Sequence, residues 1–388
     1  MLHKQRLLTP GPTPLPESVR LAMAADMIHH RKAAFRDMMD AIGRDLGALF
    51  GTSAPVLPLS ASGTGAMTAA VHGLFTPGEK VLVVEGGYFG RRWTEISLAH
   101  GLNPVILTVE LGRAVTAGQV AEALDWDGEI AGVLVQHSET STGVRHPVGD
   151  IAAVVRESRA LLVVDGISAV SVMPCPMDAW GIDCLLTGSQ KGLMLPPGLA
   201  LIALSPRARR RSEEIGSGDA YFDLPAEFAS NAKGQTHFTS PVSLLAGLRE
   251  SLRLLHVAGL DNIYRKQHAL ARMARAGVKA LGLTLFAPED YAWGLTSILL
   301  PPGMESAPLL AAAEKNYGVV MAGGQDGEFK DRILRIGHMG YVDYADLAAG
   351  LYALARSYQD LGGYLGCRDC LEQALDAYRK ALDEDMPE

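Results

Sequence analysis

A lysine and an aspartate follow two apolar segments that are predicted to be buried strands. Asp165 ends the apolar run 161–164, and Lys191 follows the run 184–187 within Gly188-Ser189-Gln190-Lys191-Gly192. A lysine near strand ends suits Schiff-base chemistry, because partial desolvation lowers the pKa of its amine. A carboxylate that closes an apolar strand is costly without a partner, and a protonated pyridine nitrogen is one such partner. Taken alone, either residue could instead be structural: a surface lysine, or an aspartate that caps a turn.

Small residues begin a predicted helix at Ser62-Gly63-Thr64-Gly65-Ala66, after the short apolar stretch 56–59. Exposed backbone N–H groups and the helix dipole make this helix start a candidate phosphate site, although many helices begin with Ser or Thr near Gly without binding an anion. The segment lacks the third glycine of a dinucleotide fingerprint and the Gly-Lys-Ser/Thr of a P-loop. Phe89 follows the apolar stretch 81–84, and its ring could stack on a flat ligand or serve only for packing.

Arg335 lies inside an apolar strand pattern, Leu334-Arg335-Ile336-Gly337. A charge in such a strand needs a partner, which is either a protein carboxylate or a ligand. Because a guanidinium can hold a carboxylate through two parallel hydrogen bonds, Arg335 is a candidate for binding a substrate carboxylate. An internal ion pair fits the pattern equally well.

The composition is that of an ordinary globular protein. Of 388 residues, 48% are hydrophobic and 20% are charged, and the formal net charge is -8, whereas a general nucleic-acid binder would show a basic face. The 4 cysteines form no disulfide framework, and Cys367 and Cys370 lack the further ligands of a zinc site. The start resembles no signal peptide, and no apolar run approaches the ~20 residues of a membrane helix. We expect a cytoplasmic protein with no metal, nucleic-acid or membrane partner.

Apolar segments alternate with helical patterns through the first two thirds of the chain. The expected buried strands are 81–84, 104–107, 132–135, 161–165, 184–187 and 199–204, and the helices between or before them include 34–50, 66–74, 115–124 and 148–158. This alternation predicts an α/β fold with a mostly parallel sheet covered by helices, and ligands at the carboxyl ends of its strands. Beyond residue 240 the pattern changes to one long helical region (243–277), short strands (283–286, 297–300, 333–336) and a charged helix (370–382). We expect an N-terminal arm (1–16), a large domain (17–255) and a smaller C-terminal α+β domain (256–388).

Together, these segments resemble the class V (fold type I) aminotransferases that use pyridoxal phosphate (PLP), nearest to the alanine–glyoxylate and serine–pyruvate group. The resemblance runs from Pro10-Gly11-Pro12 to Arg335-Ile336-Gly337. Its most specific part is Asp165-Gly166-Ile167-Ser168, followed by Gly188-Ser189-Gln190-Lys191 and Pro196-Pro197-Gly198. It implies a seven-stranded sheet and PLP as the cofactor.

The resemblance also implies a role for each matching residue. Lys191 would bind the cofactor covalently and move the substrate proton, Asp165 would pair with the ring nitrogen, and Arg335 would bind the substrate carboxylate. The remaining matches are Ile167 and Phe89 on the ring faces, Ser62, Gly63, Thr64 and Gln190 at the phosphate, Ser141 near the 3-hydroxyl, and Gly11 near the substrate. A second subunit of a homodimer would complete the phosphate site through Thr236 and Thr239, where Thr236 replaces a common tyrosine.

The implied activity is transfer of the amino group of a small L-amino acid, alanine or serine, to glyoxylate or pyruvate by a ping-pong mechanism. The absence of an evident second arginine favours these short neutral donors. One alternative is a PLP-dependent lyase such as a cysteine desulfurase, which needs a nucleophilic cysteine near the substrate. The other is a PLP-free, doubly wound binding protein or dehydrogenase, which needs a complete glycine fingerprint.

Overall fold

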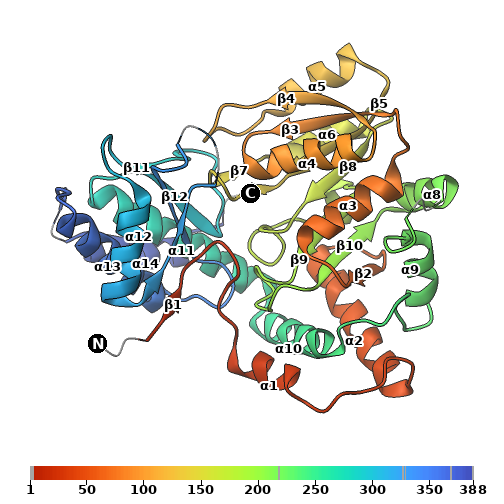
Figure 1. Ribbon diagram of the computed structural model, residues 1–388, viewed down its shortest axis with the longest axis horizontal. Coiled ribbons are helices and arrows are strands. Elements are labelled where there is room, and N and C mark those ends of the chain that lie inside the picture. The colour runs from red at the N-terminus through yellow and green to blue at the C-terminus, as the bar shows by residue number, and fades with distance from the viewer. Residues whose placement is uncertain (1–3, 217–218, 326, 328, 368, 387–388) are drawn as a thin grey trace.

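The computed structural model describes residues 4–216, 219–325, 327, 329–367 and 369–386. Its largest element is a seven-stranded sheet with the order β2-β10-β9-β8-β5-β3-β4 (Figure 1). In that order the strands are Val56–Leu59, Ala200–Leu204, Cys184–Gly188, Leu161–Asp165, Ile130–Gln136, Lys80–Glu85 and Asn103–Thr108. Strand β10 is antiparallel to both of its neighbours, and the other pairs are parallel. The expected α/β fold with a mostly parallel seven-stranded sheet is therefore confirmed.

Helices cover both faces of this sheet. One face packs against α1 (Glu17–Met23), α2 (Ala33–Phe50), α5 (Ala117–Trp126), α6 (Val148–Arg156), α7 (Met177–Trp180) and α10 (Val242–Ala258). The other face packs against α3 (Gly63–Leu74), α4 (Tyr88–Ala99), α8 (Pro206–Ile215) and α9 (Leu224–Asn231).

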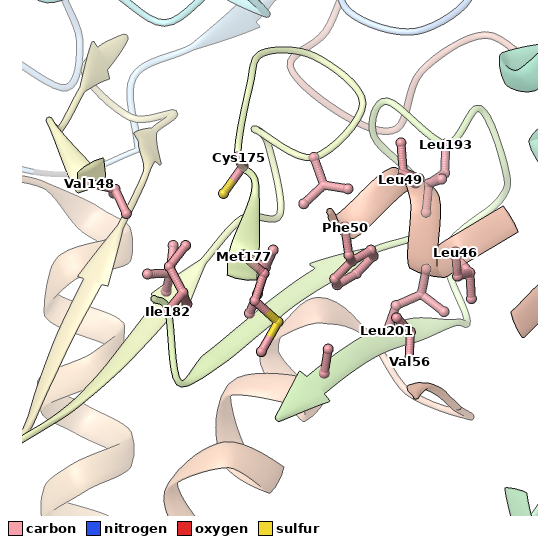
Figure 2. Packing of buried hydrophobic residues seen from close by; sticks show 14 of the residues in the cluster. Leu46, Leu49, Phe50, Val56, Val148, Cys175, Met177, Ile182, Leu193 and Leu201 are labelled. Atoms are coloured by element: carbon pink, nitrogen blue, oxygen red, sulfur yellow. The ribbon is translucent and has the colours of Figure 1, made fainter. Parts of the chain in front are cut away.

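The strand period of two explains why the strands are apolar throughout. Along β8, Leu162 and Val164 belong to the first core, whereas Leu161 and Val163 belong to the second. Both sets of side chains are buried because successive residues of a strand point to opposite faces. Figure 2 shows part of the first core, where Leu46 and Phe50 of α2 lie near Leu201 of β10.

Strand β4 departs from the expectation of a fully buried strand. It is the last strand in the sheet order, and its residues are only partly buried, with Ile106 at 48% exposure. An edge strand has one unpaired side, so apolar residues there remain accessible. The sequence pattern alone did not distinguish this edge from the interior strands.

A second sheet and a second core lie in the C-terminal part of the chain (Figure 1). The sheet is antiparallel, with the order β11 (Thr284–Leu285), β12 (Leu295–Leu299), β15 (Ile333–Gly337) and β14 (Ala322–Gly323). Its core includes residues of α11 (Leu260–Ala280), α12 (Ser306–Tyr317), α13 (Tyr344–Asp360) and α14 (Cys370–Asp383).

The single helical region expected over 243–277 is wrong. Gly259, at φ 78°, ends α10 and begins α11, and a positive φ of this kind favours glycine. Because Leu255 still belongs to the first core and Leu270 to the second, we propose that the domain boundary lies at Gly259.

The N-terminal arm connects the two parts of the molecule. Strand β1 (Arg6–Leu7) pairs in parallel with β13 (Val319–Val320), and the Gly337 N–H donates to the Leu8 carbonyl at 2.6 Å. A few residues later the Thr13 N–H donates to the Gln190 carbonyl at 3.2 Å. A small hairpin of β6 (Ser138–Glu139) and β7 (Val144–Arg145) lies after β5. No helix in the described ranges is long and apolar enough to cross a membrane.

Candidate active site

A cavity of about 240 Å³ lies at the carboxyl ends of the parallel strands, between them, the arm and β15. The predicted residues that line it are Gly11, Ser62, Gly63, Thr64, Phe89, Asp165, Ile167, Gln190, Lys191 and Arg335. These residues come from six separate segments of the chain, and the topology brings them together where parallel α/β sheets bind ligands.

Three predicted residues do not line this cavity. The Ser141 hydroxyl donates to Glu139 Oε1 at 2.6 Å, and the Thr236 hydroxyl donates to the Phe238 carbonyl at 2.7 Å. Thr239 is exposed on the surface of the chain. The polar residues of the 138–141 segment that do line the cavity are Ser138 and Thr140.

Lys191 is held at the cavity by the arm. Its Nζ donates to the Pro10 carbonyl at 2.6 Å, and its own carbonyl accepts from the Thr13 hydroxyl at 2.9 Å. Gly11 lies so close that a Cβ there would be 2.6 Å from Nζ. Burial lowers the pKa of Lys191 to about 8, and the charge of Arg335 adds to the effect while that of Asp165 opposes it. The amine is therefore much more readily deprotonated than that of a surface lysine.

Asp165 ends β8 with 5% of its surface exposed. Its Oδ1 accepts from the Ile167 N–H at 2.7 Å, and no cation of the described chain lies within ion-pair distance. Burial raises the pKa of this carboxyl to about 7, against the lowering effect of the Ile167 hydrogen bond. A cationic ligand group would therefore stabilise the charged carboxylate.

The start of α3 forms a positively charged end of the cavity. Ser62 is its N-cap without a side-chain cap hydrogen bond, so the first N–H groups remain available to an anion. Arg92 Nη1 donates to the Thr64 hydroxyl at 2.9 Å. Its guanidinium carbon is 5.0 Å from the centre of the Phe89 ring. On the other side, a Cβ on Gly63 would be 2.4 Å from the Ile167 side chain.

Arg335 lies on β15 with its guanidinium partly bound by the protein. Its Nε donates to the Gly323 carbonyl at 2.8 Å, and its Nη1 donates to the Thr140 carbonyl at 2.8 Å and to Gln325 Oε1 at 3.1 Å. Nη2 has no partner among the described residues, and none of their carboxylates forms an ion pair with Arg335. The internal ion pair left open above is thus not present in this part of the chain. Burial lowers the pKa of Arg335 to about 10, and an anionic ligand would offset that cost.

Two charged residues of the site were missed from sequence. Arg92 lines the cavity, contrary to the expectation of no second arginine. It lies three residues after Phe89, a spacing that places both on one side of a helix, which could have indicated it.

Glu139 was the second omission, and nothing in its sequence context marked it. It is fully buried, and burial raises its pKa against the effect of its hydrogen bonds. Its Oε2 accepts from the N–H groups of Phe89 and Gly90 at 3.1 and 3.0 Å and from Gln136 at 3.1 Å. Its Oε1 accepts from the Ser141 N–H at 3.0 Å as well as from the Ser141 hydroxyl.

Comparison with known proteins identifies the family. The family model described as Aminotransferase class-V matches residues 14–329. An L-aspartate–glyoxylate aminotransferase of Paracoccus denitrificans is 34% identical, over 98% of this chain and 98% of its own. The ureidoglycine–glyoxylate aminotransferase of Bacillus subtilis has a similar structure, with a TM-score of 0.92 and 26% identity over 98% of this chain and 99% of its own.

Another relative is named as a hydrogenase subunit and not as an aminotransferase. A soluble hydrogenase 42 kDa subunit of Anabaena cylindrica is 36% identical, over 93% of this chain and 95% of its own. Within the described ranges, His, Cys, Asp and Glu form no group of three or more that could hold a metal ion. The chain belongs to the class V aminotransferases, and it is an enzyme whose expected cofactor is PLP.

Proposed function

We propose that this enzyme transfers the amino group of alanine or serine to glyoxylate or pyruvate by a ping-pong mechanism. The observation that supports it most is Arg335: a buried guanidinium that lines the same cavity as Lys191 and has no acidic partner among the described residues. A substrate α-carboxylate supplies the missing negative charge. Nη2 would bind it first, and a second parallel hydrogen bond would require Nη1 to release Gln325.

The residues of the cavity fit PLP. Asp165 would bind the ring nitrogen, and Ile167 and Phe89 would contact the ring. Ser141 stays a predicted neighbour of the 3-hydroxyl, although its own hydroxyl donates to Glu139. The phosphate would be bound by the start of α3 (Ser62, Gly63, Thr64), by Gln190 and by Arg92. When bound, PLP supplies a cationic ring that accepts electron density from the reacting carbon.

The chain contributes the covalent anchor and the proton transfer. Lys191 would bind the cofactor through Nζ, and once released by the incoming amino group it would take the Cα proton of the substrate. A base is most effective when its pKa lies near the working pH, and the pKa of about 8 at Lys191 meets this condition. The Pro10 carbonyl and Gly11 would keep Nζ over the cavity, and Arg335 would fix the substrate so that its Cα–H faces the amine.

The binding role of Arg92 indicates which of two classes of amino donor the enzyme accepts. It could bind the cofactor phosphate, or it could bind the second carboxylate of a dicarboxylic donor. Its hydrogen bond to Thr64 at the start of α3 favours the phosphate, which leaves Gln325 as the neutral polar group beside Arg335. We therefore retain short neutral donors. Arg92→Gln should weaken PLP binding without changing the order of donors, whereas a selective loss of aspartate turnover would assign Arg92 to the substrate.

A homodimer would complete the phosphate site through residues 236–241. In this chain Arg31 Nη1 donates to the Thr236 carbonyl at 3.1 Å. Thr239 of the same segment is exposed. Neither Thr236 nor Thr239 lines the chain's own cavity, which fits a contribution to the site of a neighbouring subunit. Light scattering should give a dimer, and Thr239→Ala should weaken PLP binding without dissociating that dimer.

A panel of amino donors against glyoxylate and pyruvate tests the proposed reaction. We expect the highest kcat/KM with alanine or serine, and parallel double-reciprocal plots. Arg335→Gln should lower kcat/KM by roughly 10- to 100-fold, the value of one charge-assisted hydrogen bond, and the exposed Arg356→Gln serves as control. Lys191→Ala should lack the visible absorbance that borohydride removes from the wild type. A best rate with aspartate would contradict the donor assignment.

The lyase alternative gains no support from the cysteines. None of them lines the cavity in the described chain, and Cys175 and Cys184 are buried. Burial raises the pKa of Cys175 to about 12 and also raises that of Cys184, so neither is a ready nucleophile. Release of persulfide from cysteine would overturn this conclusion.

A further inference from the structure

A second cavity, of about 230 Å³, lies behind the hairpin that forms one wall of the active site. The two cavities share this hairpin: Ser138 lines the active site, and its partner in the β6–β7 register, Arg145, lines the second cavity. The neighbouring His137 also lines the second cavity, and its N–H donates to the Asp165 carbonyl at 2.9 Å. The second cavity thus adjoins the active site, but none of the predicted active-site residues lines it.

Arg145 supplies an uncompensated positive charge. Among the described residues its guanidinium has neither a hydrogen bond nor an ion pair. Its contact is with the ring of Trp293, whose centre lies 5.9 Å from the guanidinium carbon. The other charged residue on this cavity is Asp150, which is exposed and is therefore able to keep its carboxylate in solvent.

The start of α6 adds further donors. Pro147 is the N-cap, without a side-chain cap hydrogen bond, and the N–H groups of Gly149 and Asp150 have no acceptor in the described chain. Both residues line the cavity. Free N–H groups and the helix dipole attract an anion.

A buried imidazole gives independent evidence that this cavity is built for a polar ligand. His137 is 3% exposed, yet its Nδ1 has no hydrogen-bond partner among the residues that the structure describes. Burial, together with the charge of Arg145, lowers its pKa to about 3, so the ring is neutral and can donate or accept. A buried polar atom without a partner is costly, and a ligand in the cavity could provide the partner.

Aromatic side chains form the remaining walls. Trp180 and Trp293 both line the cavity, and the Trp180 ring lies 5.6 Å from that of His137 in an edge-on arrangement. Such walls fit a flat apolar body. We propose that this cavity is a second ligand site, which binds a small aromatic carboxylate between the two tryptophans, with its carboxylate at Arg145 and the start of α6.

Calorimetric titration of the PLP-loaded enzyme with benzoate tests this site. We expect Arg145→Gln to weaken benzoate binding by about 10- to 100-fold, because a charge-assisted hydrogen bond is lost. The control Arg356→Gln should bind as the wild type does. Arg335→Gln should also retain binding, which separates the second site from the active site and from the proposed transaminase function.

Asp150→Asn provides a second test that does not depend on the folding of the Arg145 variant. It removes the one negative charge that lines the cavity in the described chain, so it should bind benzoate at least as tightly as the wild type. No binding by the wild type, unchanged binding by Arg145→Gln, loss of binding in Arg335→Gln, or weaker binding in Asp150→Asn would each overturn the proposal.

Discussion

Replacing Asp165 by asparagine should have opposite effects on the cofactor-free and the PLP-loaded protein. In the cofactor-free protein the variant should be more stable above neutral pH, because it removes a buried carboxylate that has no cationic partner in the described chain. In the loaded protein it should bind PLP more weakly, because the proposed partner of the ring nitrogen is lost. Asparagine still offers an oxygen to the Ile167 N–H, so the loop after β8 keeps its hydrogen bond.

The size of the first effect follows from the pKa of Asp165, which is raised from 3.8 to about 7 in the folded chain. A carboxyl group whose pKa is raised by folding favours the folded state at low pH, and this contribution is lost as the pH rises from 3.8 towards 7. The total loss is ~4 kcal/mol, at ~1.4 kcal/mol for each pKa unit. Between pH ~5.5 and pH ~8 the wild type loses ~2 kcal/mol of this stabilisation. The asparagine variant has no titrating group at position 165 and keeps its stability over that range.

Urea unfolding of both cofactor-free proteins at these two pH values measures the effect. The stability of the variant relative to the wild type should rise by ~2 kcal/mol between the lower and the higher pH. The double difference removes any pH-independent cost of the substitution, such as altered packing. A relative stability that stays constant or falls would refute the argument that Asp165 is a buried carboxylate without a cationic partner in the described chain.

Three further substitutions or conditions test individual contacts. Uptake of PLP by the cofactor-free enzyme, followed by visible absorbance, should accelerate with pH and level off above about 8, the pKa of Lys191; an uptake rate independent of pH would contradict a lowered pKa. Glu139→Gln should destabilise the protein by ~1–3 kcal/mol in urea unfolding, because even with its oxygen at the Oε2 position the amide NH₂ would face the Ser141 N–H, and a donor left unpaired costs ~1–3 kcal/mol; a variant as stable as the wild type would show that this donor finds another partner. Gly11→Ala should lower kcat by at least tenfold, since its Cβ would collide with Nζ and its φ of 141° is strained for alanine; unchanged kcat would mean that the arm moves away from Lys191 during turnover.

The sequence was most informative where strand ends and chemical groups coincide. Strand 161–165 was predicted with its observed bounds, because four apolar residues precede one charged residue there. The same logic located Lys191 after β9 and Ser62 after β2. Since parallel strands share one carboxyl edge, separate strand predictions were enough to bring these residues into one cavity.

Features that depend on three-dimensional geometry were not predictable in this way. Ser141 matched the family pattern, but the turn of the hairpin directs its hydroxyl to Glu139, while Ser138 and Thr140 line the cavity. The exposure of β4 depends on its place at the edge of the sheet, which the strand pattern does not encode.

The charges of the active site explain why one cavity can bind both a cofactor and a substrate. Asp165 and Arg335 have no oppositely charged partner in the described chain, and burial shifts the pKa of each towards its neutral form. A protein selected only for stability would pair or remove such groups, and their retention is typical of functional sites. In the proposed function, PLP would offer a cation to Asp165 and the substrate would offer an anion to Arg335. Ionised Asp165 is the costly form in the cofactor-free enzyme. PLP should therefore raise the free energy of unfolding by more at pH ~8 than at pH ~5.5. Stabilisation that is equal at both values would mean that Asp165 is not the group that responds to the cofactor.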